Sequence, residues 1–210
     1  IMMYRLSQRR APMTWHGFLI KRIKRIVPLY WLLTTVLIGL MLLLPGLFSG
    51  SHLDPVHAMA SYLLIPYSDS QDIIRPLLVP GWTLTFEMLF YAIFAALLSL
   101  RVERIVPALA LVFACYIAAV EWLVPENRVL TWLANPVVFE FVFGCFVARL
   151  YLQVRSRPAW LPHLLAAAAI LLFSGSILFD VGWMGRTLIW GVPAMLLVAA
   201  AALPQRLRAG

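Results

Sequence analysis

Six apolar runs, each long enough to cross a lipid bilayer, constrain the fold of this chain more than any other feature. A membrane-spanning helix needs roughly 20 apolar residues, because the hydrocarbon core is roughly 30 Å thick. Hydrophobic residues make up 63% of the chain and charged residues 12%, far from the composition of ordinary soluble domains. The sequence therefore predicts an all-α, polytopic transmembrane helical bundle. The six predicted spans are Ile26–Phe48, Trp82–Leu100, Ile105–Leu123, Val129–Leu152, Trp160–Phe179 and Thr187–Leu203.

The basic residues support this map of the spans. The net charge is +8, but the cations gather in short links between spans, so we expect a bilayer and no nucleic acid as a partner. Six spans place 14 of the 17 Lys and Arg on one side, which the positive-inside rule assigns to the cytoplasm. We therefore expect a multi-pass protein with both ends of this sequence cytoplasmic. The segments on that side are 4–25, 101–104, 149–159 and 204–210.

Residues 49–80 are more polar and form the predicted extracytoplasmic loop. They contain three acids, Asp54, Asp69 and Asp72, and four prolines that interrupt any long helix. The apolar stretch His57–Ile65 is too short to cross a bilayer, so we expect it to form a re-entrant or interfacial helix.

Glu87 is an acid inside the second span. It lies about 8 Å past Trp82 along a helix, and an ionisable group at such depth costs about 2.5–3.5 kcal/mol on insertion scales. Thr83, Glu87 and Tyr91 follow one another at intervals of four residues and share one helix face. This polar stripe suits proton transfer or hydrogen bonding to a substrate hydroxyl. The alternative is that Glu87 pairs with a basic side chain and holds two helices together.

Arg22 and Arg25 precede the first predicted span and face the same way on a helix, three residues apart. Two guanidinium groups at the cytoplasmic face suit a phosphorylated ligand. The alternative is that they orient the span or contact anionic lipid. Tyr30 and Trp31 follow them, and an interfacial aromatic belt explains that pair equally well.

Glu140 is a second acid inside an apolar span. The preceding Asn135-Pro136 resembles a helix N-cap followed by proline at the first helical position. We therefore expect a helix to start at Pro136, with Val129–Ala134 along the interface. Gly144 lies one turn after Glu140 and would permit close helix approach, so either a structural pairing or a pocket role fits Glu140. The four histidines have no carboxylate or cysteine at metal-ligand spacing, and we predict no metal site.

Three motifs together resemble the bacterial membrane acyltransferase 3 family, in its branch that acetylates exopolysaccharide. They occur in the expected order across nearly the whole chain. The first is Arg22-x-x-Arg25-Ile-Val-Pro-Leu-Tyr30-Trp31. The second is Pro80-Gly81-Trp82-Thr83-Leu84-Thr85-Phe86-Glu87-x-x-Phe90-Tyr91, and the third is Asn135-Pro136…Glu140-Phe141…Gly144.

The resemblance implies a single transmembrane acyltransferase domain over residues 1–210, in the bacterial inner membrane. It implies transfer of an acyl group, commonly acetyl, from acyl-CoA to hydroxyls of a surface polysaccharide or lipid-linked glycan, with acyl-CoA as co-substrate and no resident cofactor. Arg22 and Arg25 would bind the donor, and Glu87 would be catalytic. The pocket-lining residues implied are Tyr30, Trp82, Thr83, Tyr91 and Glu140.

One departure from the family pattern is important. The family's catalytic histidine follows an arginine by a spacing that Arg5 and His16 reproduce, eleven residues apart. These two lie in a polar basic segment and not in an apolar span, so we regard the match as coincidental. We expect the sequence to be an incomplete domain, without the family's first and last spans and inactive alone.

Two other classes of protein share these features. A transporter or flippase of a lipid-linked glycan would have the same helices, buried acids and basic face, although the paired broken helices of many transporters are not visible. A scaffold subunit without chemistry is the third class. Dependence of product formation on acetyl-CoA would discriminate them. The acceptor, the position acylated and the oligomeric state are left open by the sequence.

Overall fold

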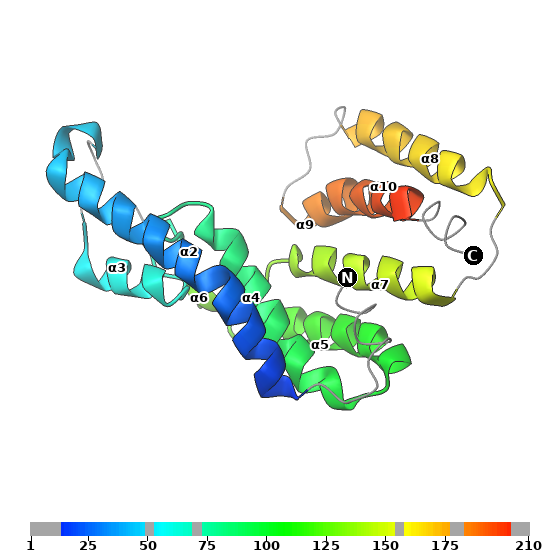
Figure 1. Cartoon of the computed structure of the whole chain (residues 1–210), viewed down its shortest axis with the longest axis horizontal. Coiled ribbons are helices and arrows are strands. Elements are labelled where there is room, and N and C mark those ends of the chain that lie inside the picture. Colours follow the sequence, from blue (N-terminus) through cyan, green and yellow to red (C-terminus); the bar gives the residue numbers. More distant parts are fainter. Residues whose placement is uncertain (1–13, 49–52, 69–72, 154–157, 177–182, 203–210) are drawn as a thin grey trace. The chain divides into compact units, whose positions relative to one another are not determined.

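The computed structural model describes residues 14–48, 53–68, 73–153, 158–176 and 183–202 (Figure 1). These residues form helices joined by loops, with one isolated bridge between Ser68 and Ile74. The predicted all-α fold class is confirmed for this part of the chain. Predictions that concern Arg5, Asp69, Asp72 and the basic links at 154–157 and 203–210 lie outside the described residues.

The helices follow one another along the chain in the order predicted from the apolar runs. The longer ones are α2 (Trp15–Leu43), α4 (Gly81–Ala96), α5 (Val102–Leu123), α7 (Val138–Gln153), α8 (Leu161–Ser176) and α10 (Val192–Ala202). The shorter ones are η1 (Pro45–Phe48), α3 (Pro55–Tyr62), η2 (Leu97–Ser99), α6 (Arg128–Leu133), α9 (Trp183–Arg186) and the π-helix η3 (Thr187–Gly191).

Four helical segments are long and apolar enough to cross a membrane: Trp15–Leu43, Gly81–Ser99, Val102–Leu123 and Arg128–Gln153. They correspond to the first four predicted spans. The fifth and sixth predicted spans contain shorter apolar helices, Leu161–Gly175 and Thr187–Ala202. A straight helix of that length is about 24 Å long, less than the roughly 30 Å of a hydrocarbon core. Length and composition therefore support a membrane protein, with four clear spans among the described residues.

The first span begins earlier than the hydropathy pattern predicts. Helix α2 starts at Trp15, not at Ile26, and includes the basic residues up to Arg25. The hydroxyl of Thr14 caps its first turn by accepting a hydrogen bond from the Gly17 N–H. Lysine and arginine are good helix formers, so a charged face does not end the helix. The helix ends at Leu43, before Pro45, because the residue preceding a proline avoids the helical region.

The helices group into two compact units. The N-terminal unit comprises residues 14–96 and 119–134. In it, α2 packs against α4 and α3, and the interface of α2 with α4 is aromatic. Phe18 of α2 lies 5.7 Å from the ring of Tyr91 and 5.3 Å from the ring of Phe94. Phe90 and Phe94 are almost completely buried, so this aromatic contact forms the core of the unit.

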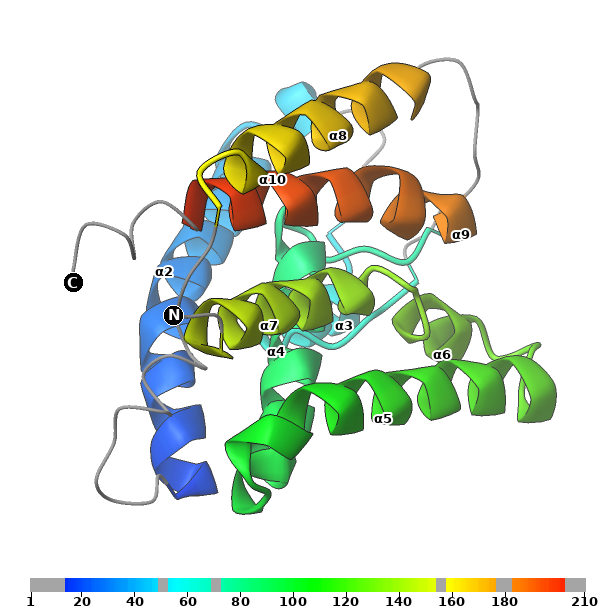
Figure 2. The same ribbon diagram turned by 90° about the vertical axis from the view of Figure 1, so that its right-hand side faces the viewer.

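The C-terminal unit comprises residues 97–118 and the described residues from 135 to 202. In it, α10 lies between α7 and α8 and contacts both (Figure 2). The π-helix η3 leads directly into α10 and also contacts α7 and α8. Phe113 of α5 and Phe139 of α7 meet with ring centroids 6.4 Å apart.

The predicted helix break before Glu140 is confirmed. Helix α6 ends at Leu133 and α7 begins at Val138, two residues after the start predicted at Pro136. The side chain of Asn135 accepts a hydrogen bond of 2.9 Å from the Val137 N–H, as an N-cap does. The loop helix expected within His57–Ile65 also forms, as α3, with Asp54 as its N-cap and Pro55 at its first position.

Candidate active site

Helices α2 and α4 of the N-terminal unit run antiparallel, and this places the first two motifs side by side. Tyr30 of α2 lies against Gly81 at the start of α4. A Cβ atom on Gly81 would be 2.8 Å from the Tyr30 ring and 3.0 Å from Pro76. The hydroxyl of Tyr30 donates a hydrogen bond of 3.0 Å to the carbonyl of Ser61 in α3. Glycine is therefore required at position 81 by close approach, and not by its backbone angles.

A cavity of about 400 Å³ opens between α2, α4 and the segment that precedes α4. This volume lies within the roughly 300–1,000 Å³ of typical ligand pockets. The polar side chains of its lining are those of Arg25, Tyr30, Glu87 and Tyr91. The rest of the lining is mainly apolar: Ile26, Leu29, Leu33, Leu78, Pro80, Gly81 and Leu84. We refer to this space as the Glu87 cavity.

Glu87 is half-buried in the wall of the Glu87 cavity. One of its carboxylate oxygens accepts a hydrogen bond from the hydroxyl of Tyr91, one turn later on α4. Among the residues that the structure describes, Glu87 forms no ion pair, so the structural pairing considered from the sequence is not seen there. Within the described part of the chain, no second hydrogen bond to this carboxylate is seen.

Arg22 and Arg25 both reach Tyr91. The guanidinium carbon of Arg22 lies 5.1 Å from the centre of the Tyr91 ring and 5.2 Å from that of Phe18, within cation–π range. Arg25 lines the Glu87 cavity itself, and both cations interact electrostatically with the Tyr91 hydroxyl. Tyr91, predicted from the sequence as part of the polar stripe and as a pocket-lining residue, thus connects the two arginines to Glu87.

Trp82 and Thr83 lie outside the lining of the Glu87 cavity. Thr83 is exposed, and its hydroxyl donates a hydrogen bond of 2.8 Å to the carbonyl of Pro80. Trp82 meets Phe86 edge to face at 6.0 Å, and Phe86 in turn stacks on Trp132 at 4.7 Å. Of the five predicted pocket residues, Tyr30 and Tyr91 line this cavity, and Glu140 belongs to the other unit.

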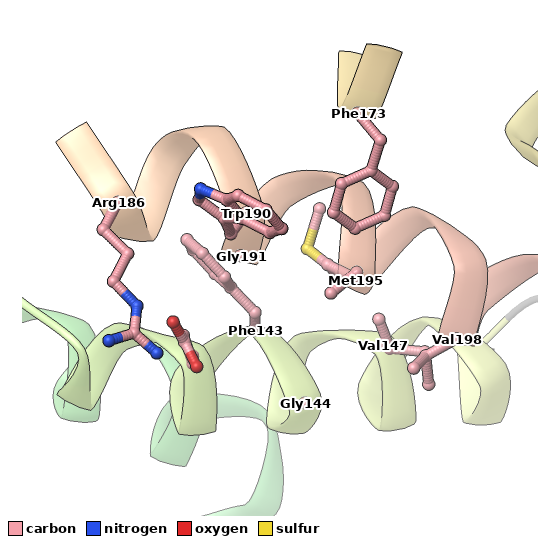
Figure 3. Close-up of a pocket in the computed structure, with 11 residues that line it drawn as sticks. Phe143, Gly144, Val147, Phe173, Arg186, Trp190, Gly191, Met195 and Val198 are labelled. Atoms are coloured by element: carbon pink, nitrogen blue, oxygen red, sulfur yellow. The ribbon is translucent and has the colours of Figure 1, made fainter. Parts of the chain in front are cut away.

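Glu140 lines a second cavity of about 400 Å³ in the C-terminal unit, between α7, α8, η3 and α10 (Figure 3). Arg186 also lines this space and interacts electrostatically with Glu140. The expectation that Gly144 allows close helix approach is wrong. A Cβ atom on Gly144 would meet no atom of the described residues within 4 Å, and Gly144 instead lines this cavity. We refer to this space as the Glu140 cavity.

A polar cluster in the loop holds the start of α3. Asp54 accepts hydrogen bonds from the Val56 N–H and the Tyr67 hydroxyl, each 2.9 Å long. These two bonds hold the pKa of Asp54 below its usual value, and the bond from Val56 has the larger effect. The hydrogen bond to Asp54 raises the pKa of Tyr67. His57 stacks on Tyr67, and its Nε2 lies 2.7 Å from the Arg75 carbonyl. The cluster stabilises the loop whose Ser61 binds Tyr30.

Sequence reasoning missed several residues that shape these cavities. Ser61 of α3 positions Tyr30 through a hydrogen bond, Pro76 lies against Gly81, and no sequence pattern pointed to either. Arg186, at the end of α9, and Trp190, in the π-helix η3, line the Glu140 cavity. The only available signal was that Arg186 is one of three basic residues placed on the extracytoplasmic side. Among the described residues, no group of three or more His, Cys, Asp or Glu is arranged to hold a metal ion.

Comparison with known proteins agrees with the motifs. The profile of a family described as an acyltransferase domain, acyltransferase 3, matches residues 2–209. The exopolysaccharide production protein ExoZ of Rhizobium meliloti (strain 1021) is 37% identical over 157 residues. The aligned region covers 74% of this chain and 49% of ExoZ, so the chain spans about half the length of this curated relative. No solved structure matches the chain significantly.

Proposed function

Because this chain belongs to the acyltransferase 3 family, we propose that its protein transfers an acyl group from acyl-CoA to hydroxyl groups of an exopolysaccharide or its lipid-linked precursor. Acetyl is the proposed acyl group. ExoZ is named as an exopolysaccharide production protein, which supports a polysaccharide as the acceptor, and the region that matches it includes most of the chain. The single structural observation that carries the proposal is the Glu87 cavity, in which Glu87, Tyr91 and Arg25 meet.

The proposed reaction is an acyl transfer from a thioester to an alcohol. The oxygen of the acceptor hydroxyl attacks the thioester carbonyl carbon, a carbon–oxygen bond forms and the carbon–sulfur bond breaks. A general base takes the hydroxyl proton, which finally protonates the departing CoA thiolate. The resemblance assigns the base to a histidine. In this scheme the free carboxylate oxygen of Glu87 orients that histidine or the acceptor hydroxyl.

Arg22 and Arg25 are the proposed donor-binding residues. A guanidinium group binds a phosphate through two parallel, charge-assisted hydrogen bonds, and CoA carries several phosphates. The cation–π contacts of Arg22 with Phe18 and Tyr91 restrict its side chain. They therefore reduce the entropy that Arg22 loses when it binds an anion. Arg25, exposed and at the rim of the Glu87 cavity, is free to reach the same anion.

We also propose the bacterial inner membrane as the location, with α2 beginning on the cytoplasmic side. The basic residues of α2 support this orientation by the positive-inside rule. It places the two arginines at the side of the membrane where acyl-CoA is available.

The test is acyl transfer by the full-length protein in membranes, with radiolabelled acetyl-CoA as the donor. We expect Glu87→Gln to reduce transfer to the glycan fraction at least tenfold at unchanged protein level. Glu126→Gln is the matched control, because Glu126 is exposed and outside the Glu87 cavity. Normal transfer by Glu87→Gln would remove Glu87 from the mechanism.

The donor site is tested separately with Arg22→Ala and Arg25→Ala. Hydrogen bonds to charged groups contribute about 1.5–3 kcal/mol each, so each substitution is expected to raise the KM for acetyl-CoA about tenfold or more. Lys24→Ala is the control, since Lys24 lies between the two arginines in sequence, is exposed and does not line the Glu87 cavity. Equal effects of all three substitutions would mean that only the overall positive charge is needed.

A further inference from the structure

The Glu140 cavity has a largely apolar and aromatic lining. Its described lining carries one formal charge of each sign, from Glu140 and Arg186. The Glu87 cavity also has one glutamate and one arginine, but a second cation, Arg22, lies beside its Tyr91. Since the described lining of the Glu140 cavity offers a single cation beside an acid, we expect its ligand to be neutral overall and not a polyanion such as CoA.

Three aromatic rings face into the Glu140 cavity. Figure 3 shows Phe143 of α7, Phe173 of α8 and Trp190 of η3 projecting into one space, with Arg186 at one end and Val147 and Val198 at the other. The rings of Phe173 and Trp190 lie 5.8 Å apart at an angle of 64°. Trp190 is 54% exposed, so much of its surface is accessible to a ligand.

The π-helix η3 produces this arrangement. A π-helical turn adds a residue to the helix and occurs frequently at functional sites. Helix η3 contains Trp190 and Gly191, and it follows directly after Arg186, the last residue of α9. A Cβ atom on Gly191 would lie 3.3 Å from both Glu140 and Phe143, so glycine permits the close approach of η3 to α7. Glu140 and Arg186 line the same cavity as these aromatic rings.

We propose that the Glu140 cavity binds a neutral sugar residue of the acceptor glycan. A sugar ring has apolar faces made of C–H groups, which pack on aromatic rings, and a rim of hydroxyl groups. Glu140 accepts hydrogen bonds from hydroxyls, and Arg186 donates to their oxygens. The volume of about 400 Å³ has room for such a ring. This inference rests on the proposed function for the identity of the acceptor and adds to it a separate recognition site.

Gly144 offers a direct way to fill the Glu140 cavity. Because a Cβ atom there meets no atom of the described residues within 4 Å, we expect the side chain of Gly144→Leu to extend into the Glu140 cavity, which Gly144 lines. Replacing a glycine inside a helix also favours the helix. Gly175→Leu is the matched control: Gly175 lies in α8 of the same unit, has equally open surroundings and is outside the Glu140 cavity.

The experiment measures binding of cellobiose, a neutral disaccharide, to the full-length protein in lipid nanodiscs by saturation-transfer NMR. No acyl donor is present, so the result does not depend on catalysis. We expect saturable binding that weakens at least fivefold in Gly144→Leu and in Trp190→Ala, and that is unchanged in Gly175→Leu. Trp190→Ala keeps the test valid if Gly144→Leu is poorly folded.

Two results would overturn the inference. One is that cellobiose does not bind, and the other is that it binds equally well to Gly144→Leu and Trp190→Ala, as expected if lipid fills the cavity. Failure of the proposed function is distinguishable, because it would appear as absent transfer from acetyl-CoA in the wild-type protein. In a competent enzyme, Gly144→Leu should leave the KM for acetyl-CoA unchanged.

Discussion

Gly81→Ala should destabilise the protein through a single contact. The new Cβ atom would lie 2.8 Å from a ring carbon and from the hydroxyl oxygen of Tyr30, and 3.0 Å from Pro76, distances that force the ring or α4 to move. Overpacking of this kind costs about 1–3 kcal/mol, and loss of the Tyr30–Ser61 hydrogen bond costs about 1 kcal/mol more. Alanine regains about 0.5–1 kcal/mol of helix propensity. The expected net loss is about 2 kcal/mol of unfolding free energy.

The assay is equilibrium unfolding of the full-length protein by SDS in mixed micelles, followed by circular dichroism. Gly39→Ala is the control, since a Cβ atom at that position of α2 meets no atom within 4 Å. It should be neutral or slightly stabilising. A double-mutant cycle isolates the clash with Tyr30: Gly81→Ala introduced into a Tyr30→Ala protein should cost clearly less than in the wild-type protein, because only the 3.0 Å contact with Pro76 remains. Equal behaviour of Gly81→Ala and Gly39→Ala would refute the reasoning.

The other predictions test the proposed active site, the turn before α7 and the loop around α3. Tyr91→Phe removes the hydrogen bond to Glu87 and should lower kcat/KM for acyl transfer about tenfold, because a bond to a charged group contributes about 1.5–3 kcal/mol; initial rates in membranes measure this. Asn135→Ala removes the hydrogen bond to the Val137 N–H in the turn before α7 and should cost about 1 kcal/mol in SDS unfolding. Because the folded pKa of Asp54 is lowered, its stabilising contribution is present above the usual carboxyl pKa and is lost as the pH falls through the folded value. Tyr67→Phe should move that pKa back up, as a carboxyl-carbon NMR titration would show.

The hydropathy pattern was sufficient to predict the fold class and four of the spans, because the bilayer fixes the length of an apolar helix. It misplaced the start of α2 because it treats charge as the end of a span. The residues from Trp15 to Arg25 extend the helix by about three turns on the basic side. Helix formation depends on backbone hydrogen bonds and propensity, which Lys and Arg satisfy well, and it continues where the hydrocarbon ends.

The span map alone did not predict the proximity of Arg25 to Glu87. It placed Arg25 at the cytoplasmic face and Glu87 nearer the far side, and the pairing of α2 with α4 brings both into one cavity. That pairing is set by Tyr30 against Gly81 at one end and by Phe18 against Tyr91 at the other. These are contacts between residues far apart in sequence, and they involve glycine and aromatic residues whose spacing follows no period.

The two intramembrane acids show why one sequence signal leads to two kinds of site. Glu87 and Glu140 both interrupt an apolar run, and burial of either requires a polar partner. Glu87 finds a hydroxyl on its own helix, Tyr91, while the nearby guanidinium groups interact with that tyrosine. Glu140 interacts electrostatically with Arg186, which belongs to another helix. Two guanidinium groups, Arg22 and Arg25, therefore accompany the single acid at the Glu87 cavity and suit an anionic ligand, whereas the described lining of the Glu140 cavity has one arginine for one acid and suits hydroxyl groups. The partner of each acid decides which chemistry its cavity can recognise.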